Sequence, residues 1–241
     1  MRKFEEDYHK KQVEHPYRST EVFIEWLEDL HFLNHDENIC ICDMACGGGA
    51  NTLYIGNRYQ NIQVVGMDIN QEFIDYGKEV LQCRSKHMNC KLYVEDWYHI
   101  DLKWIKKFDG IISFQTLFTF PEYRVPLKKL TDLQPKWIAF SSLFYEGNIE
   151  YTIKFKDYYR RSEGAEYTEY YYNIHSMPQV EQYLKSLGYH KFKFIPFDID
   201  IDLPKQDTLD VGTYTKKTED GKRIQISGGM MMPWYFVVAY N

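Results

Sequence analysis

The sequence has few cysteines, and their positions argue against both a disulfide framework and a metal site. There are five, an odd number, and Cys40, Cys42 and Cys46 fall within one predicted strand and the loop after it. Neighbouring side chains of a strand point to opposite faces, which disfavours a bridge between them. The Cys40-Ile41-Cys42 spacing lacks the two-to-four-residue gap of a zinc site, and no second pair matches it. We therefore expect no bound metal.

Long apolar runs and an excess of basic residues are also missing. No segment is apolar for long enough to span a bilayer, and the N-terminus, Met1–Asp7, is charged and has no apolar signal segment. We expect a cytoplasmic protein without a membrane partner. The formal net charge of −6 argues against a nucleic-acid partner, which needs a dense basic face. The best basic cluster, Lys216, Lys217, Lys222 and Arg223, is better explained as a solvated face.

What the chain does have is a full core and many tyrosines. Its 241 residues are 44% hydrophobic and 27% charged, which is ordinary for one globular domain. Tyrosine occurs 21 times, and many of these residues lie between Tyr145 and Tyr189. A tyrosine combines an apolar ring with a polar tip. Such a cluster lines a pocket for a polar ligand or packs a core or an interface, and composition leaves both open.

Strand-like and helix-like segments alternate over the first part of the chain. Strands that alternate with helices predict a parallel sheet with right-handed crossovers. Apolar residues from Val22 to Leu30 have helical spacing, and Ser19 or Thr20 is expected to cap that helix. Further helices are expected at Thr52–Tyr59 and Glu72–Leu81. The predicted strands are Asn38–Met44, Val64–Met67, Lys91–Val94, Phe108–Phe114 and Trp137–Ser142.

The pattern changes after the fifth predicted strand. The segment Tyr145–Ile174 is aromatic, charged and irregular, which indicates an insertion. Alternating apolar residues in Lys191–Leu203 predict a strand exposed on one face, with a break near Pro196. The Asp220-Gly221 pair is a strong hairpin signal. The remaining predicted elements are a helix at Met177–Leu187, hairpin strands at Thr208–Thr215 and Lys222–Ser227, and a last strand at Trp234–Tyr240.

Three positions, each at the end of a predicted strand, indicate a nucleotide-like cofactor. Glycines in the loop 43–49 allow a close ligand approach, and the helix after it offers free N–H groups to a carboxylate. Asp43 suits a ligand ammonium group, directly or through water. Asp68 ends the second strand and suits a ribose diol. Asp96 suits the adenine amino group, and Trp97 is expected to border the adenine ring.

The same first two features would also fit a dinucleotide site. That fingerprint requires a third glycine, and Thr52 occupies its place, so we expect the helix to pack less closely on its strand. The acidic and aromatic pair after the third strand favours a nucleoside that ends in an amino acid, such as S-adenosylmethionine (SAM). Two other classes stay open, a nicotinamide oxidoreductase and a non-catalytic SAM-binding module.

The stretch from about residue 38 to residue 120 resembles the core of the class I SAM-dependent methyltransferases. Asp43, Gly47 and Gly49 match the family's acidic residue and glycine-rich loop, while Ala45 stands where glycine is usual. The resemblance implies SAM as cofactor and S-adenosylhomocysteine (SAH) as product. It implies an α/β, Rossmann-like, seven-stranded and mostly parallel sheet with helices on both faces, whose antiparallel last strand is inserted between its neighbours. The cofactor-binding residues it implies are Asp43, Ala45, Cys46, Gly47, Gly49, Asp68, Ile69, Asp96, Trp97, Ser113 and Phe114.

The methyl acceptor is less well defined. His175 is a candidate general base because histidine titrates near neutrality, and a surface or helix-capping role is the alternative. A predicted anion-binding cluster suits a phosphate or carboxylate, which arginine forks match, and a solvated charged face is the alternative. Its members are Lys154, Lys156, Tyr158, Tyr159, Arg160 and Arg161. The candidate catalytic residues are His175, Tyr17 and Gln115, and the candidate substrate-binding residues are Tyr8, Tyr158, Arg160, Arg161, Tyr171 and Tyr172.

We therefore predict a single domain over residues 1–241, with an N-terminal lid and helices (1–37), a SAM-binding core (38–144) and acceptor-side insertions (145–175 and 204–229). The predicted partner is a small molecule, anionic if the basic cluster near residue 160 binds it, and the chain is expected to be a monomer or homodimer. A weak resemblance of residues 228–236 to bacterial small-molecule methyltransferases, some encoded with surface-polysaccharide genes, favours O-methylation of a sugar or phosphorylated compound. N-methylation of a small amine, such as a phosphorylated amino alcohol, is the alternative.

Overall fold

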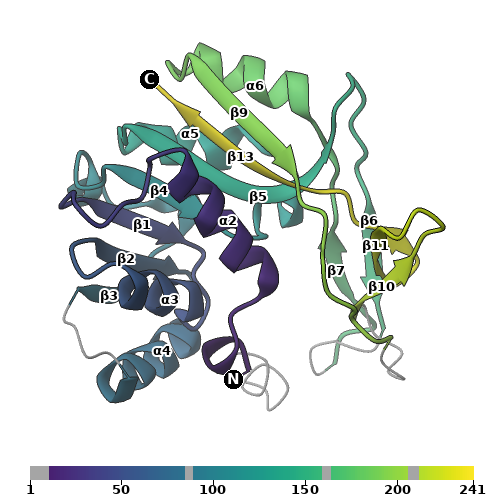
Figure 1. Ribbon diagram of the computed structural model, residues 1–241, viewed down its shortest axis with the longest axis horizontal. Coiled ribbons are helices and arrows are strands. Elements are labelled where there is room, and N and C mark those ends of the chain that lie inside the picture. The colour runs from purple at the N-terminus through teal and green to yellow at the C-terminus, as the bar shows by residue number, and fades with distance from the viewer. Residues whose placement is uncertain (1–10, 85–88, 159–163, 206–211) are drawn as a thin grey trace.

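The computed structural model describes residues 11–84, 89–158, 164–205 and 212–241, and a mixed β-sheet forms its centre (Figure 1). The strand order is β3-β2-β1-β4-β5-β13-β9, and β8 pairs with the end of β5 as an eighth strand. Strands β1 to β5 run parallel, whereas β13 is antiparallel to both β5 and β9. The predicted sheet and its inserted last strand are thus confirmed. The strands are β1 (Cys40–Met44), β2 (Gln63–Asp68), β3 (Cys90–Val94), β4 (Gly110–Ser113), β5 (Trp137–Tyr145), β8 (His175–Ser176), β9 (Lys191–Pro196) and β13 (Trp234–Tyr240).

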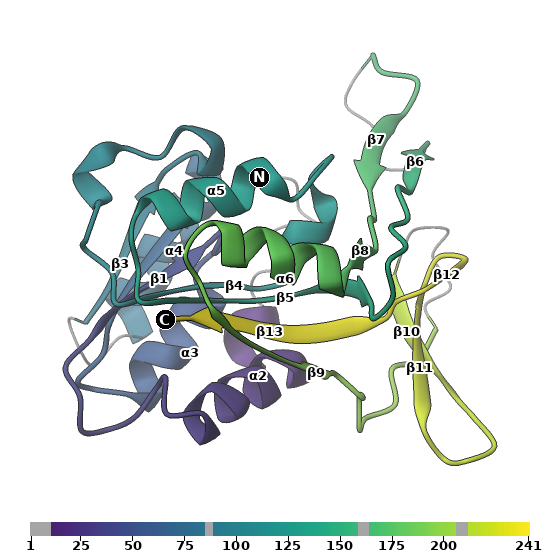
Figure 2. The same ribbon diagram turned by 90° about the horizontal axis from the view of Figure 1, so that it is seen from above.

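Helices cover both faces of this sheet, as predicted. Figure 2 shows α5 and α6 on one face and α2 and α3 on the other. Leu127 of α5 and Val180 of α6 belong to one buried apolar cluster, and Phe23 of α2 and Ile55 of α3 belong to a second. The helices are α2 (Arg18–Asp29), α3 (Ala50–Arg58), α4 (Gln71–Arg84), α5 (Arg124–Asp132) and α6 (Met177–Ser186), with 3-10 turns η1 (Trp97–His99), η2 (Leu102–Trp104) and η3 (Leu117–Thr119).

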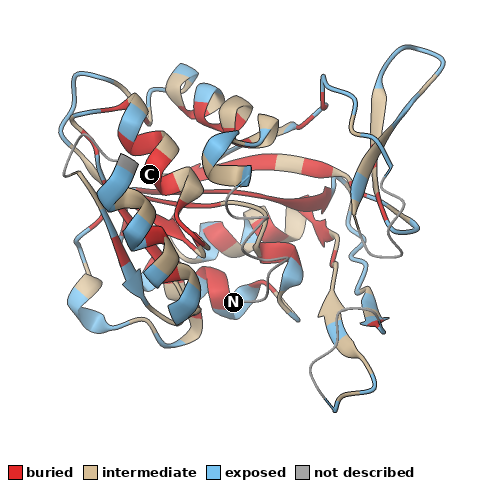
Figure 3. Cartoon of the chain, turned by 90° about the horizontal axis from the view of Figure 1, so that it is seen from below, coloured by how far each residue is buried: buried red, intermediate tan, exposed pale blue. Residues whose placement is uncertain are grey.

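The core lies between the sheet and these two helical layers. Figure 3 shows that buried residues concentrate on the strands and on the helix faces that meet them. In β5, only the last residue, Tyr145, is exposed. Burial of a large apolar side chain contributes about 1.5–3 kcal/mol, so these strands carry much of the stability and hold their carboxyl ends in fixed positions. Among the described residues, no helix is long and apolar enough to cross a membrane.

The segment predicted as an insertion contains regular secondary structure. Its strands β6 (Lys154–Asp157) and β7 (Thr168–Tyr171) form an antiparallel pair in which the rings of Phe155 and Tyr170 lie 5.5 Å apart. Cross-strand aromatic pairs of this kind stabilise a two-stranded ribbon. A second accessory sheet contains β10 (Thr213–Lys217), β11 (Arg223–Ser227) and β12 (Met230–Met231). The predicted hairpin turn is confirmed, with Gly221 at a φ of 82°. Figure 1 places both accessory sheets near the carboxyl end of β5.

The expected cap of α2 was also wrong. The helix begins at Arg18, and its N-cap residue, Tyr17, makes no side-chain capping bond. Ser19 and Thr20 already lie inside the first turn. Their hydroxyl groups bond to other segments, Ser19 to Gln115 and Thr20 to Asn51. These tertiary hydrogen bonds replace the local capping bond that the sequence pattern predicts.

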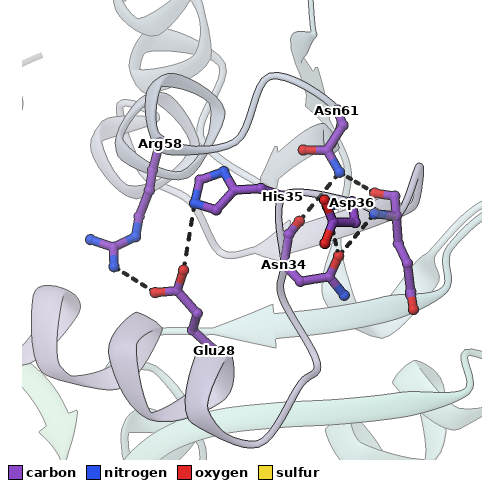
Figure 4. Close-up of polar contacts among 7 residues, drawn as sticks. Glu28, Asn34, His35, Asp36, Arg58 and Asn61 are labelled. Carbon is purple, nitrogen blue, oxygen red and sulfur yellow. Dashed lines mark hydrogen bonds and ion pairs between the residues drawn. The ribbon is translucent and has the colours of Figure 1, made fainter.

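At its other end, α2 is held to α3 and to the loop before β1 by polar contacts (Figure 4). Glu28 accepts a hydrogen bond from Arg58 at the end of α3. Asn34 caps the loop by accepting from the backbone of Asp36 at 2.9 Å, and Asn61 donates to the carbonyl of Asn34 at 3.2 Å. Exposed pairs of this type contribute about 0–1 kcal/mol each. Their main effect here is to fix the position of α2 relative to α3.

Candidate functional site

The loop between β1 and α3 has an unusual backbone. Ala45, Gly47 and Gly49 all have positive φ angles, of 62°, 54° and 78°. Glycine adopts this region without a steric cost, whereas a residue with a Cβ atom loses about 1–2 kcal/mol there. Ala45 therefore keeps the conformation that the family's usual glycine would adopt. Gly49 is the N-cap residue of α3, so the free N–H groups of the first helical turn face this loop.

Asp43 lies beneath the loop and is completely buried. Its Oδ2 atom accepts a hydrogen bond of 2.7 Å from the Thr52 hydroxyl. Its Oδ1 atom is buried and has no hydrogen-bond partner among the described residues. Burial raises the pKa of Asp43 to about 7, although the bond from Thr52 opposes that rise. An unpaired buried acceptor usually has a water or ligand partner, so this atom fits the ammonium group of SAM or a water that bridges to it.

Helix α3 packs closely against β2, whereas the expected looser packing of α3 on β1, the strand before the loop, stays a prediction. A Cβ atom placed on Gly66 of β2 would lie 2.6 Å from the Thr52 hydroxyl oxygen and 2.5 Å from Leu92 Cδ2. Helix α3 therefore lies close to β2, and the glycine that permits this contact is Gly66 on the strand, not a residue of the helix. Thr52 is consequently free to hold Asp43 through its hydroxyl group.

Asp68 and Ile69 follow at the end of β2. The Asp68 carboxylate accepts hydrogen bonds from the backbone of Gly47 at 2.8 Å and Asn70 at 2.9 Å. Each carboxylate oxygen has a second acceptor site, so the group still suits a ribose diol. The apolar side chain of Ile69 is 67% exposed. An uncovered apolar side chain beside this carboxylate fits the face of an adenine ring.

Asp96 is held in place at the end of β3. It caps η1 by accepting from the backbone of Tyr98 at 2.9 Å, and it contacts His99 Nδ1 at 2.6 Å. The hydrogen bond to His99 lowers the pKa of the Asp96 carboxyl group. Trp97 is only 5% exposed, and its indole N–H donates to the carbonyl of Pro126 at 2.8 Å. Trp97 thus anchors the turn. The expected contact between the edge of its indole ring and adenine stays a prediction.

Cys46 lies within the loop, but its thiol packs against the protein. The side chain belongs to a small buried cluster with Ile74 and Leu92, and its backbone N–H donates to the Met67 carbonyl at 2.9 Å. Any contribution of Cys46 to cofactor binding therefore comes from its backbone and from the shape of the loop. Among the described residues, no group of three or more His, Cys, Asp or Glu side chains is arranged to hold a metal ion.

The segment after β4 is the strained part of the site. Gln115 has a φ of 49°, a conformation that costs a residue with a Cβ atom about 1–3 kcal/mol and that concentrates at functional sites. Its backbone N–H donates to Ser141, at 3.1 Å to the carbonyl and 2.9 Å to the hydroxyl oxygen. Phe114 packs edge-on against Phe23 of α2 at 5.4 Å. Ser113 is buried, and its hydroxyl has no hydrogen-bond partner among the described residues.

His175 lies in β8 and is neither on the surface nor a helix cap. It is 3% exposed, and its ring lies edge-on to Tyr123 at 5.1 Å and to Phe144 at 6.1 Å. The cap of α6 is the next residue, Ser176. Burial lowers the pKa of His175 to about 4, so the imidazole is neutral at pH 7. Its Nε2 atom is buried without a hydrogen-bond partner in the described structure. A role as general base stays a prediction, and it requires that the acceptor can reach this atom.

The tyrosines of the insertion divide into two groups. Tyr158 is 59% exposed, whereas Tyr172 is half-buried and edge-on to Phe118 of η3 at 4.9 Å. Tyr171 is half-buried beneath Lys154, whose ammonium lies 5.9 Å from the ring centre. The insertion thus presents some tyrosines outward and uses others to pack against the main sheet.

The predicted anion-binding cluster is only partly described. Lys154 pairs with Glu169 at 2.7 Å, and Lys156 lies 4.0 Å from the centre of the Tyr167 ring. These two lysines therefore already have partners. Tyr17, a catalytic candidate, is 37% exposed at the start of α2. The candidates Tyr8, Arg160 and Arg161 lie outside the described residues.

Asn173 is a structural residue of the acceptor side, and the sequence pattern did not reveal it. The side chain is buried, and its Nδ2 atom donates to the carbonyl of Phe120 at 2.8 Å while its Oδ1 atom accepts from the backbone of Ile153 at 3.1 Å. Its backbone N–H donates to Phe118 at 2.9 Å. Asn173 thereby joins the base of the insertion to η3. A polar residue between Tyr172 and Ile174 was the only signal in the sequence.

The glycine-rich loop, the acidic residues after β2 and β3, and the inserted antiparallel strand define the class I SAM-dependent methyltransferases. A model of the methyltransferase domain family matches residues 35–154, about half of the chain. The chain belongs to this methyltransferase family, and solved structures that share its fold hold SAM or SAH. No sequence among the curated proteins is significantly similar to it.

Solved structures share the fold at low sequence identity. A SAM-dependent methyltransferase from Methanosarcina mazei is 13% identical, with a TM-score of 0.58 over 89% of this chain and 96% of that one. Magnesium protoporphyrin IX methyltransferase from Synechocystis PCC 6803, with bound SAH, is 12% identical, with a TM-score of 0.54 over 93% of this chain and 83% of that one. At such identities these structures establish the fold and leave the substrate undefined.

Proposed function

We propose that this methyltransferase transfers a methyl group to a hydroxyl group of a small polar metabolite, such as a sugar or a phosphorylated compound. The observation that supports the proposal is the tyrosine-rich insertion near the carboxyl end of β5 (Figure 1). Tyr145, Tyr151 and Tyr158 are 45%, 45% and 59% exposed there. Their hydroxyl groups and ring faces suit a small ligand with several polar groups. One fold relative, magnesium protoporphyrin IX methyltransferase, is also named for a small molecule.

The division of labour within the chain follows from this placement. In this proposal 38–144 holds the cofactor, and 145–175 and 204–229 surround the acceptor. Helix α2 of segment 1–37 is packed into the core, so a lid would come from the residues before it. Bound SAM supplies a methyl group on a sulfonium, which is already a good leaving group. The protein has to align the acceptor and exclude water, and alignment alone contributes up to about 7–11 kcal/mol. Asp43 would hold the ammonium end of the cofactor and Asp68 its ribose, while Gln115 would face the acceptor side.

A second candidate is N-methylation of a small amine, such as a phosphorylated amino alcohol. The burial of His175 favours it, because a pKa of about 4 and an enclosed Nε2 atom make this histidine a poor base in the conformation described. A hydroxyl acceptor has to lose its proton during transfer, whereas a neutral amine attacks through its lone pair. Exposed tyrosine rings also suit a substituted ammonium product.

The test combines binding with a metabolite panel. Calorimetry should show that the full chain binds SAH and does not bind NAD. SAH release is then followed while sugars, sugar phosphates, amino alcohols and their phosphates are offered with SAM. Turnover with a hydroxyl compound supports the first proposal, and turnover with an amine supports the second. SAH binding without turnover of any small molecule would contradict both.

A further inference from the structure

We propose that Ser19, in the first turn of α2, is a positioning residue that orients the side-chain amide of Gln115 toward the methyl acceptor. In this arrangement the Gln115 Oε1 atom accepts a hydrogen bond from the O–H or N–H group that is to be methylated. The inference rests on the proposed function, since it assigns a task on the acceptor side of the same site.

The first observation is where the hydroxyl groups of α2 point. Helix α2 makes no side-chain cap of its own, so Ser19 and Thr20 are available for tertiary contacts. Gln115 Nε2 donates to the Ser19 hydroxyl oxygen at 3.1 Å. Thr20 donates to the Oδ1 atom of Asn51 at 2.9 Å, in the first turn of α3. One helical turn therefore contacts both the cofactor-loop helix and the segment after β4.

The second observation is that Gln115 is held at both ends. Its backbone is in the left-handed region, with a φ of 49°, and its N–H is bonded to Ser141 of β5. Its side-chain nitrogen is bonded to Ser19 of α2. In the described part of the chain, its Oε1 atom accepts no hydrogen bond. The backbone of Gln115 is therefore held by β5 and its side-chain nitrogen by α2, which leaves the side-chain carbonyl oxygen for a ligand.

The third observation is that Ser19 sits on a firmly held support. Arg18 donates through Nε to both carboxylate oxygens of Asp200, at 3.0 Å each. Phe23, one turn further along, stacks on Phe236 of β13 at 4.7 Å and meets Phe114 edge-on. The start of α2 is thus tied to the segment after β9, to the last strand and to the residue before Gln115. A hydroxyl group on this turn has a defined position relative to β4.

The chemistry follows from the properties of an amide. A glutamine side chain does not take up a proton at neutral pH, so Gln115 accepts a hydrogen bond without acting as a base. This role suits an acceptor that carries an O–H or N–H donor and whose lone pair must point toward the methyl group. If the amide rotated freely, its N–H₂ group would present donors to the same position. In the described orientation, the hydrogen bond from Nε2 to Ser19 keeps the amide from rotating freely and holds its N–H₂ group away from that position.

The experiment uses the full chain with SAH bound. Hydrogen exchange of the Gln115 side-chain N–H₂ group is followed by NMR, with the signal assigned by its loss in Gln115→Glu. Ser19→Ala is expected to speed this exchange about tenfold, as the loss of one hydrogen bond would. Ser19→Thr should restore it, and Ser186→Ala, at the end of α6, is the matched control. The affinity for SAH in Ser19→Ala should stay within about twofold of wild type.

The kinetic part uses the acceptor that SAH release identifies. Ser19→Ala should lower kcat by about tenfold with little change in the KM for SAM, and Ser19→Thr should recover most of it. Unchanged side-chain exchange in Ser19→Ala would overturn the inference, as would faster exchange with an unaltered kcat. If the wild-type chain fails to bind SAH, the proposed function fails instead, so the two failures are distinguishable.

Discussion

Replacing Asp43 with asparagine removes a carboxyl group that the fold buries completely. Burial raises the folded-state pKa of Asp43 from 3.8 to about 7. Since the folded-state value lies above the unfolded-state value, ionisation opposes folding. Below a pH of about 3.8 the Asp43 carboxyl group is protonated in both states, and its contribution to the stability of the fold is fully present. That contribution is lost progressively as the pH rises through about 7.

The size of the loss follows from the two pKa values. A rise from 3.8 to about 7 corresponds to about 4 kcal/mol, at about 1.4 kcal/mol per pH unit. Between pH 5 and pH 8 the unligated protein should lose about 2–3 kcal/mol of this amount. Asp43→Asn has no charge to bury and loses none of it. Any weakening of the hydrogen bond from Thr52 is the same at both pH values and cancels in the comparison.

The assay is urea unfolding of the unligated wild type and Asp43→Asn at pH 5 and pH 8. The free energy of unfolding of the variant, relative to that of wild type, should be larger at pH 8 than at pH 5 by about 2–3 kcal/mol, so the variant is relatively more stable at pH 8. Asp75→Asn, at an exposed position of α4, is the matched control and should change little between the two conditions. The reasoning is refuted if the difference between Asp43→Asn and wild type is the same at both pH values.

Four further substitutions test other parts of the site. Asp68→Ala should weaken SAH binding about 10–100-fold by calorimetry, through the loss of charge-assisted hydrogen bonds to the ribose, and unchanged affinity would show that the ribose binds elsewhere. Ala45→Gly should change the free energy of unfolding by no more than about 1 kcal/mol, because relief of the left-handed strain offsets the entropy of the added glycine; a loss above that would contradict the strain argument. Gly66→Ala should destabilise the fold by about 1–3 kcal/mol in urea unfolding, because its Cβ atom meets Thr52, and a neutral result would mean that α3 is free to move. Asn173→Ala should cost about 2–3 kcal/mol by leaving backbone groups of η3 and the insertion unpaired, and a result near zero would remove its role in joining them.

The cofactor half of the molecule was largely predictable from the sequence because its signals are local. Each parallel strand is a short apolar run, and the functional residue follows directly after it, as Asp68 and Asp96 do. The inserted strand Trp234–Tyr240 was equally visible as the last apolar run. Packing was not visible in the same way. The close contact between α3 and β2 could have been supplied by a glycine on either partner, and only the fold shows that Gly66 supplies it while Thr52 bonds to Asp43.

The acceptor half was less predictable for a physical reason. Its structure depends on contacts between segments that are far apart in the chain, such as Asn173 with η3 and Ser19 with Gln115, and each contact uses one polar residue without a surrounding pattern. Ser19 was predicted as a cap because that is what a serine before an apolar helix does when nothing else competes. In the fold, Gln115 competes, and the helix begins at Arg18, with Tyr17 in the N-cap position. Substrate choice in a fold of this class therefore rests on residues whose partners are set by tertiary packing, which explains why the cofactor could be inferred from the sequence and the methyl acceptor could not.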